Sequence, residues 1–94
     1  MSKKDWIVTE HEEYKKTIIQ APKWVRDFIE NELKPKMETY PFTNAIRLRN
    51  RLEGFYEQKI GNYRLVFRVE LYTHEVQYCW IRAKPHATAQ NYIK

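Results

Sequence analysis

The pair Gly61-Asn62 separates two β-prone segments, Phe55 to Ile60 and Tyr63 to Glu70. A two-residue connection with glycine at its first central position is typical of a type II′ turn, which joins two antiparallel strands into a tight hairpin. Such a turn also sets the strand register, because a slip of one residue would send every side chain to the opposite face of the sheet. The sequence therefore predicts a hairpin in which Lys59 lies opposite Arg64.

Side chains alternate between the two faces of a strand, so this register divides the hairpin into an inward and an outward set. The inward set is apolar or aromatic and should belong to the core: Tyr56, Ile60, Tyr63, Leu65, Phe67 and Val69. The outward set is mostly charged: Phe55, Glu57, Lys59, Arg64, Val66 and Arg68. A third strand, Val76 to Arg82, is expected to place Cys79 and Ile81 inward and Tyr78, Trp80 and Arg82 outward.

The chain before the hairpin shows helical periodicity after a short β-prone run at residues 6–9. Residues 10–20 predict one helix, and a second is expected from Pro22, which suits a first helical turn, to about Leu33. Pro35 is expected to end that helix, and residues 35–44 to form a connecting loop. These segments predict an α+β fold in which an N-terminal helix pair packs on one face of a small antiparallel β-sheet, with residues 1–94 forming a single domain.

The net charge of +5 is unevenly distributed. Residues 44–94 carry nine Lys or Arg residues against four Glu residues, whereas the two signs balance in residues 1–43. On the outward face, cations would stand beside aromatic rings: Lys59, Arg64, Arg68 and Arg82 with Phe55, Tyr78 and Trp80. Cations grip phosphates and rings stack on unpaired bases, so this face favours single-stranded RNA as the ligand. The alternative is a solvated basic face on which Lys and Arg stems lie over the rings.

Lys59 directly opposite Arg64 is an unfavourable arrangement. Like charges that face each other across a strand pair destabilise it by up to about 1 kcal/mol, and a fold selected only for stability would avoid them. We therefore expect an anionic group to compensate these charges.

The cysteine, histidine and apolar content exclude several classes of protein. Cys79 is the only cysteine, which excludes an internal disulfide, suits a reducing compartment and predicts a small buried strand residue. His11 and His74 have no partner at metal-ligand spacing and are interpreted as surface residues. No stretch is long and apolar enough for a signal peptide or a membrane-spanning helix, so we expect a cytoplasmic protein without membrane association.

Residues 52–69 read LEGFYEQKIGNYRLVFRV, and this run resembles the core signature of the RelE/ParE toxin superfamily. Ala21-Pro22-Lys23 is similar to the junction of the helix pair in that family. The resemblance implies the toxin of a type II toxin–antitoxin system, held by a cognate antitoxin in a hetero-oligomer. RelE-type members are mRNA interferases that enter the ribosome, cleave messenger RNA and so inhibit translation. The alternative is a ParE-type inhibitor of DNA gyrase without nuclease activity.

The same resemblance implies an endoribonuclease reaction in which a ribose 2′-hydroxyl attacks the neighbouring phosphate, without a metal or other cofactor. The implied catalytic cations are Lys59, Arg64 and Arg82. Glu57 stands where some relatives have a second lysine, and it is either a general base or a salt-bridged structural partner. The candidates for proton transfer or base stacking near the C-terminus are His86 and Tyr92. The residues expected to bind RNA are Arg47, Arg49, Arg51, Arg68, Tyr78 and Trp80.

Overall fold

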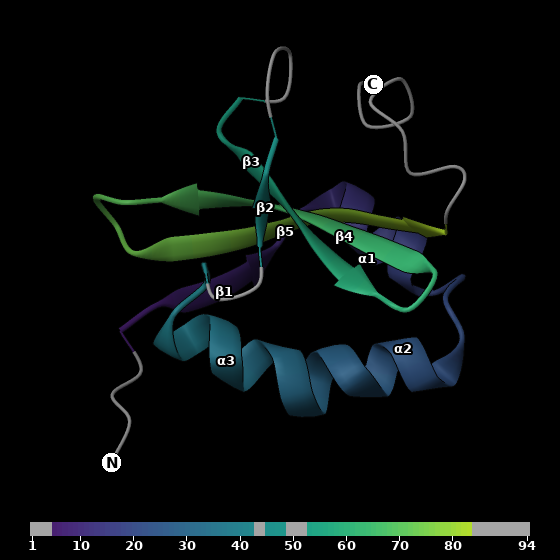
Figure 1. Ribbon diagram of the computed structural model, residues 1–94. Coiled ribbons are helices and arrows are strands. Elements are labelled where there is room, and N and C mark those ends of the chain that lie inside the picture. The colour runs from purple at the N-terminus through teal and green to yellow at the C-terminus, as the bar shows by residue number, and fades with distance from the viewer. Residues whose placement is uncertain (1–4, 43–44, 49–52, 84–94) are drawn as a thin grey trace.

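The computed structural model describes residues 5–42, 45–48 and 53–83, which form a five-stranded sheet and the helices that pack against it (Figure 1). The strands are β1 (Ile7–Glu10), β2 (Ile46–Arg47), β3 (Phe55–Ile60), β4 (Tyr63–Glu70) and β5 (Glu75–Ala83). They lie in the order β1-β5-β4-β3-β2. The helical elements are α1 (Glu12–Ile18), α2 (Lys23–Phe28), the π-helical segment η1 (Ile29–Leu33) and α3 (Lys34–Thr39).

β3 and β4 form the hairpin that the Gly61-Asn62 connection predicts. Lys59 pairs with Arg64, and the other pairs of the hairpin also follow the predicted register. Gly61 has a φ of +58°, and among the described residues His74 is the only non-glycine with positive φ. The turn therefore has positive φ at its first central residue alone, which is the pattern of type II′ and fits the twist of the adjoining strands.

The sheet is mixed, which corrects the expectation of a small antiparallel sheet. β3, β4 and β5 form the antiparallel meander, but β1 pairs in parallel with β5, with Ile7 opposite Glu75. β2 adds a short antiparallel edge strand beside β3. The β-prone run at residues 6–9 carried no information on its direction, because parallel pairing depends on the long crossover that follows a strand.

The second helix is longer than the sequence predicts, and Pro35 does not end it. α2, η1 and α3 follow one another without a break from Lys23 to Thr39. In η1 the backbone N–H of Lys34 donates to the carbonyl of Ile29, five residues back, so the helix is widened immediately before the proline. Pro35 follows this widened turn at the start of α3, so the π-type hydrogen bond comes directly before the residue that has no N–H to donate. The predicted loop over residues 35–44 is therefore wrong for its first part.

The helices take separate places against the sheet (Figure 1). α1 packs along β5, whereas the long segment from α2 to α3 runs across the sheet and reaches β1 with its α3 end. The expected packing of an antiparallel helix pair is not confirmed, since the main partner of α1 is a strand. No helix among the described residues is both long and apolar enough to cross a membrane.

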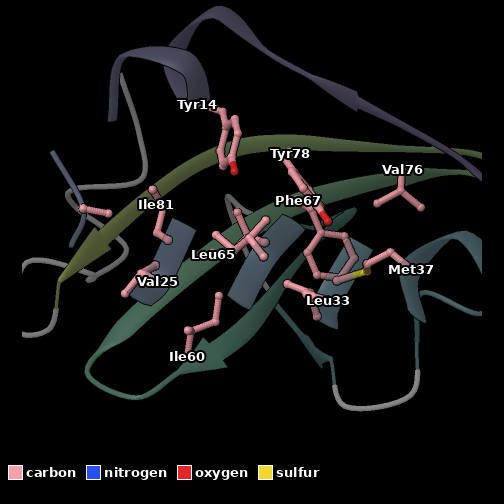
Figure 2. Close-up of a cluster of buried hydrophobic side chains, with 12 residues drawn as sticks. Tyr14, Val25, Leu33, Met37, Ile60, Leu65, Phe67, Val76, Tyr78 and Ile81 are labelled. Atoms are coloured by element: carbon pink, nitrogen blue, oxygen red, sulfur yellow. The ribbon is translucent and has the colours of Figure 1, made fainter. Parts of the chain in front are cut away.

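The core lies between the sheet and the long helical segment (Figure 2). From the bend before α2 and from the long helical segment it takes apolar side chains at four-residue intervals: Ala21, Val25, Ile29, Leu33 and Met37. All six inward residues predicted for the hairpin belong to it, with Ile60, Leu65 and Phe67 buried and Tyr56, Tyr63 and Val69 partly buried. The turn-based register thus correctly predicted which face of the hairpin is covered.

A β-bulge in β5 changes the face of the sheet on which two side chains of the predicted third strand lie. Val66 pairs with Trp80, but the next residue of β4, Phe67, pairs with Tyr78, so Cys79 is an extra residue. Tyr78 consequently points into the main core and is 1% exposed, whereas Cys79 packs on the outer face with Val66 and Trp80. The outward Tyr78 and the inward Cys79 were wrong predictions, because strict alternation does not survive an inserted residue. The predicted burial of Cys79 is confirmed.

α1 covers the part of the β5 edge with which β1 does not pair. As the chain leaves β1, the backbone N–H of His11 donates to the carbonyl of Tyr78 at 2.8 Å. Further along α1, Oγ1 of Thr17 accepts a hydrogen bond of 3.1 Å from the backbone N–H of Ile81 and donates to the carbonyl of Glu13. An edge N–H buried under a helix would be costly without such an acceptor.

Thr17→Val should therefore lower the free energy of unfolding by about 1–3 kcal/mol, because valine keeps the shape but leaves the buried N–H of Ile81 without its acceptor. Thr39→Val is the matched control, since Oγ1 of Thr39 makes the same kind of bond to the carbonyl of Pro35, at 3.1 Å, on the exposed end of α3. Urea denaturation of both variants measures the difference. Equal losses would show that the Thr17 hydroxyl does not stabilise the β5 edge.

Candidate functional site

The outer face of the sheet carries a row of cations across its three central strands. Lys59 on β3 pairs with Arg64 on β4, and Arg64 pairs in turn with Arg82 on β5. Lys59 is exposed, while the side chains of Arg64 and Arg82 are only 12% and 20% exposed. The fold therefore brings together the three cations expected at the site and holds two of them partly withdrawn from solvent. We refer to Lys59, Arg64 and Arg82 as the cation row.

The hairpin itself fixes the guanidinium of Arg64. Its Nη1 donates to the carbonyls of Gly61 and Tyr63, at 2.9 Å each, so the side chain folds back toward the turn. Its Nε lies 3.8 Å from Oε1 of Glu57, whose side chain is 15% exposed. The salt-bridged state considered for Glu57 is thus present, and its role as a general base stays a prediction.

A carboxylate from α1 reaches the other end of the cation row. Nη2 of Arg82 lies 3.6 Å from Oε2 of Glu13, whose side chain is 28% exposed. The start of α1 places this carboxylate, because Nδ1 of His11 accepts from the N–H of Glu13 at 3.1 Å and caps the helix. Glu13 was not predicted from the sequence, since no local pattern links α1 with the end of β5. The one available signal was the expectation that an anion compensates the cations.

Two carboxylates of the chain itself supply at least part of that compensation. The opposed like charges therefore do not by themselves require an external anion, although this was the expectation from the sequence. Both contacts are longer than the roughly 2.7–2.9 Å of a charge-assisted hydrogen bond. Glu13 and Glu57 consequently lower the repulsion within the cation row without tight bonds to its guanidinium groups.

The aromatic part of the outer face differs from the prediction. Tyr78 lies on the opposite face because of the bulge, so the expected contact of Tyr78 with RNA on the outer face is wrong. Trp80 does face outward, but it is 9% exposed because Leu48 and Phe55 pack against its cluster. Arg68 is exposed and stands 5.6 Å over the ring of Phe55 in a cation–π contact. The centre of the outer face is therefore a closed apolar cluster, with cations at its margins.

The remaining site residues predicted from the sequence divide into two groups. Arg47 lies exposed in β2, at the edge of the sheet. Four others lie outside the described residues, and their predicted roles stay predictions: Arg49, Arg51, His86 and Tyr92. His11 and His74 are both exposed, as predicted.

The buried titratable groups are unsuited to chemistry at neutral pH. Burial raises the pKa of the Cys79 thiol to about 11, against a lowering by the charge of Arg68, so the thiol stays protonated. Burial also raises the pKa of the Tyr14 and Tyr78 phenols well above the usual value. Within the described residues, no group of three or more His, Cys, Asp or Glu side chains is arranged to hold a metal ion.

Comparison with solved structures identifies relatives of this fold. A chain of a RelBE toxin–antitoxin complex from Mycobacterium tuberculosis has a TM-score of 0.77 and 16% identity, over 85% of this chain and 92% of that chain. E. coli toxin RelE, as an arginine-substituted mutant bound to a peptide of its antitoxin, has a TM-score of 0.70 and 22% identity, over 96% of both chains. A YoeB/ParE toxin from Agrobacterium tumefaciens has a TM-score of 0.67 and 14% identity, over 82% of this chain and 96% of that chain.

No protein-family model matches the sequence, and a search of curated proteins gave no match. The structural comparisons show that the chain has the fold of RelE-type toxins, so the resemblance of residues 52–69 to that superfamily is confirmed for the fold. A shared fold does not assign an activity, and the activity has to be argued from the site.

Proposed function

We propose that the protein is a RelE-like toxin of a type II toxin–antitoxin system and cleaves messenger RNA on the ribosome. The cation row carries this proposal, because three cations occupy adjacent strand positions on one face of a fold that RelE toxins share. Phosphoryl transfer depends mainly on positioning and on stabilising negative charge around the phosphate. Lys59, Arg64 and Arg82 offer that charge in one line.

In the proposed reaction, the carboxylate of Glu57 takes the proton of a ribose 2′-hydroxyl while the 2′-oxygen attacks the adjacent phosphorus. The bond from phosphorus to the 5′-oxygen of the next nucleotide breaks and leaves a 2′,3′-cyclic phosphate. The released 5′-oxygen takes up a proton, for which His86 and Tyr92 remain the candidate donors. The cation row stabilises the negative charge that develops on the phosphate oxygens.

The proposal includes a cognate antitoxin that keeps the toxin inactive in a hetero-oligomer in the cytoplasm. The solved relatives from M. tuberculosis and E. coli support it, since both structures contain an antitoxin or a peptide of one. An acidic or amphipathic segment would complement the cation row and the apolar helix surface, either as a helix in a groove or as an added strand. The ribosome and messenger RNA are the other proposed partners.

A gyrase inhibitor of the ParE type is the second candidate. It is favoured by the likeness to the YoeB/ParE toxin of Agrobacterium tumefaciens and by the ion pairs of both arginines in the cation row. A protein-binding toxin without catalysis does not need cations that are available to a phosphate. In that case Arg64 and Arg82 would act as partly buried structural groups.

Brief induction of the protein in living cells separates the two candidates. The nuclease predicts broken messenger RNA within minutes, with 2′,3′-cyclic phosphate ends at the break and unchanged DNA topology. Intact messages together with gyrase-linked DNA breaks would refute the nuclease and support the gyrase inhibitor. Co-expression of the cognate antitoxin should suppress either effect and serves as the control for specific toxicity.

A further inference from the structure

Trp24 stands at the surface beside the turn between β3 and β4. It is 54% exposed, although the neighbouring Val25 is fully buried. The core cluster of the described residues does not include it. Of the three tryptophans it is the most exposed, since Trp6 is half-buried and Trp80 is 9% exposed. A single exposed apolar side chain is common at protein surfaces and does not by itself indicate a binding site.

The β3–β4 turn holds the indole in place. A Cβ atom added to Gly61 would lie 2.8 Å from Cη2 of Trp24, so the indole covers backbone that only glycine leaves accessible. The ring of Tyr63 meets it edge to face, with centroids 6.4 Å apart and an angle of 82° between the planes. The side chain is therefore oriented by two fixed contacts, while about half of the residue remains open to solvent.

Two cations of the row lie at the same turn. Nη1 of Arg64 donates to the carbonyl of Gly61, the same residue that Trp24 covers, so the guanidinium and the indole flank one turn. Lys59, two residues before the turn, is exposed on the cation row. The turn is thus contacted both by Arg64, from the Lys59 end of the cation row, and by an exposed aromatic ring that is held in place.

We propose that Trp24 is a stacking platform for an unpaired base of single-stranded RNA at this end of the cation row. The proposal rests on the proposed function in that RNA is the ligand. Single-stranded RNA presents a phosphate and a base at every nucleotide, so a phosphate held at Arg64 brings a neighbouring base to the turn. Stacking uses the face that every base has, and Trp24 therefore contributes affinity rather than sequence preference.

A protein surface without acidic groups fits this place less well than RNA does. Interfaces between proteins favour aromatic residues but are depleted in lysine, and Lys59 is exposed two residues before the turn that holds the ring. Positive charge beside an exposed ring is instead the combination that holds single strands, where cations track the backbone and rings receive the bases.

Fluorescence titration of the full-length protein with a single-stranded 2′-O-methyl oligoribonucleotide tests the proposal, because this probe lacks the attacking hydroxyl and is not cleaved. The oligonucleotide should quench tryptophan emission, and an abasic oligonucleotide with the same number of phosphates should quench it much less. Trp24→Ala should weaken the Kd about 5- to 140-fold, the range for one stacked base. Trp24→Phe should keep most of the affinity but lose the quenching.

Tyr72→Ala is the matched control, since Tyr72 is 98% exposed beyond the opposite end of β4 and should not affect binding. Parental affinity in folded Trp24→Ala, or equal quenching by the abasic probe, would overturn the platform. So would a loss of antitoxin binding with unchanged RNA affinity, which would make Trp24 a protein contact. Base-dependent quenching in a protein that leaves messages intact in cells would refute the nuclease and leave the platform standing.

Discussion

Replacing Arg64 or Arg82 with alanine should slow RNA cleavage at least about 10²-fold while the protein stays folded. Each guanidinium belongs to the cation row, and loss of one preorganised donor at developing negative charge commonly costs this much. The two variants should differ in stability. Arg64→Ala removes two hydrogen bonds to carbonyls of the turn and leaves Glu57, at 15% exposure, without this partner. Arg82→Ala affects Glu13, which is more exposed at 28%, and should destabilise the fold less.

Cleavage of ribosome-bound messenger RNA by purified protein, together with thermal melts, measures both effects. Lys36→Ala is the matched control, because it removes an exposed cation from α3, outside the cation row and away from Trp24. A substitution at an exposed position of this kind changes stability little, and we expect cleavage within about twofold of the parent. Parental cleavage rates in both folded arginine variants would refute the site.

Glu57→Gln should slow cleavage by about 10²- to 10⁴-fold with normal ribosome binding, the usual range for a lost general base. Glutamine keeps the size and the hydrogen bonding of glutamate but cannot take up the proton of the 2′-hydroxyl. A ribose hydroxyl releases its proton only at a pH far above neutral, so the cation row alone does not complete the reaction. Glu57 is the carboxylate on the outer face of the hairpin away from its ends, beside the cations that would hold the phosphate.

Glu13→Gln separates proton transfer from arginine placement. Glu13 and Glu57 each pair with one arginine of the cation row, at 3.6 and 3.8 Å, but Glu13 comes from α1 rather than from the hairpin. If Glu57 is the base, Glu13→Gln should slow cleavage far less than Glu57→Gln. Equal effects of the two substitutions would show that both carboxylates only position arginines. Lost ribosome binding in Glu57→Gln would mean that Glu57 organises the face.

The hairpin could be predicted from the sequence because its two-residue turn alone determines how the two strands pair. The Gly61-Asn62 turn set the register, the register set the facing, and the pairing of Lys59 with Arg64 followed. The same reasoning placed Arg82 beside Arg64, since the residues after the bulge keep the predicted facing. These features depend on contacts between segments that are close in the sequence, where turn geometry leaves few alternatives.

The missed features depend on contacts between distant segments. In β5, Tyr78, Cys79, Trp80 and Ile81 are all apolar, so the sequence offered no alternation that would reveal the bulge. Pro35 is a residue that ordinarily ends a helix. Nothing in the sequence indicated the widened turn in η1 that accommodates it. Glu13 faces Arg82 only because α1 lies against β5.

The parallel pairing of β1 with β5 has a consequence for the order of folding. Ile7 pairs with Glu75, so the sheet is complete only when segments far apart in the sequence meet. Such non-local pairing forms more slowly than a hairpin. β5 also carries Arg82, the last cation of the row. During synthesis, the β3–β4 hairpin can therefore form before the chain has a complete sheet or the full cation row. An incomplete chain would thus lack the arrangement of cations to which we assign RNA cleavage.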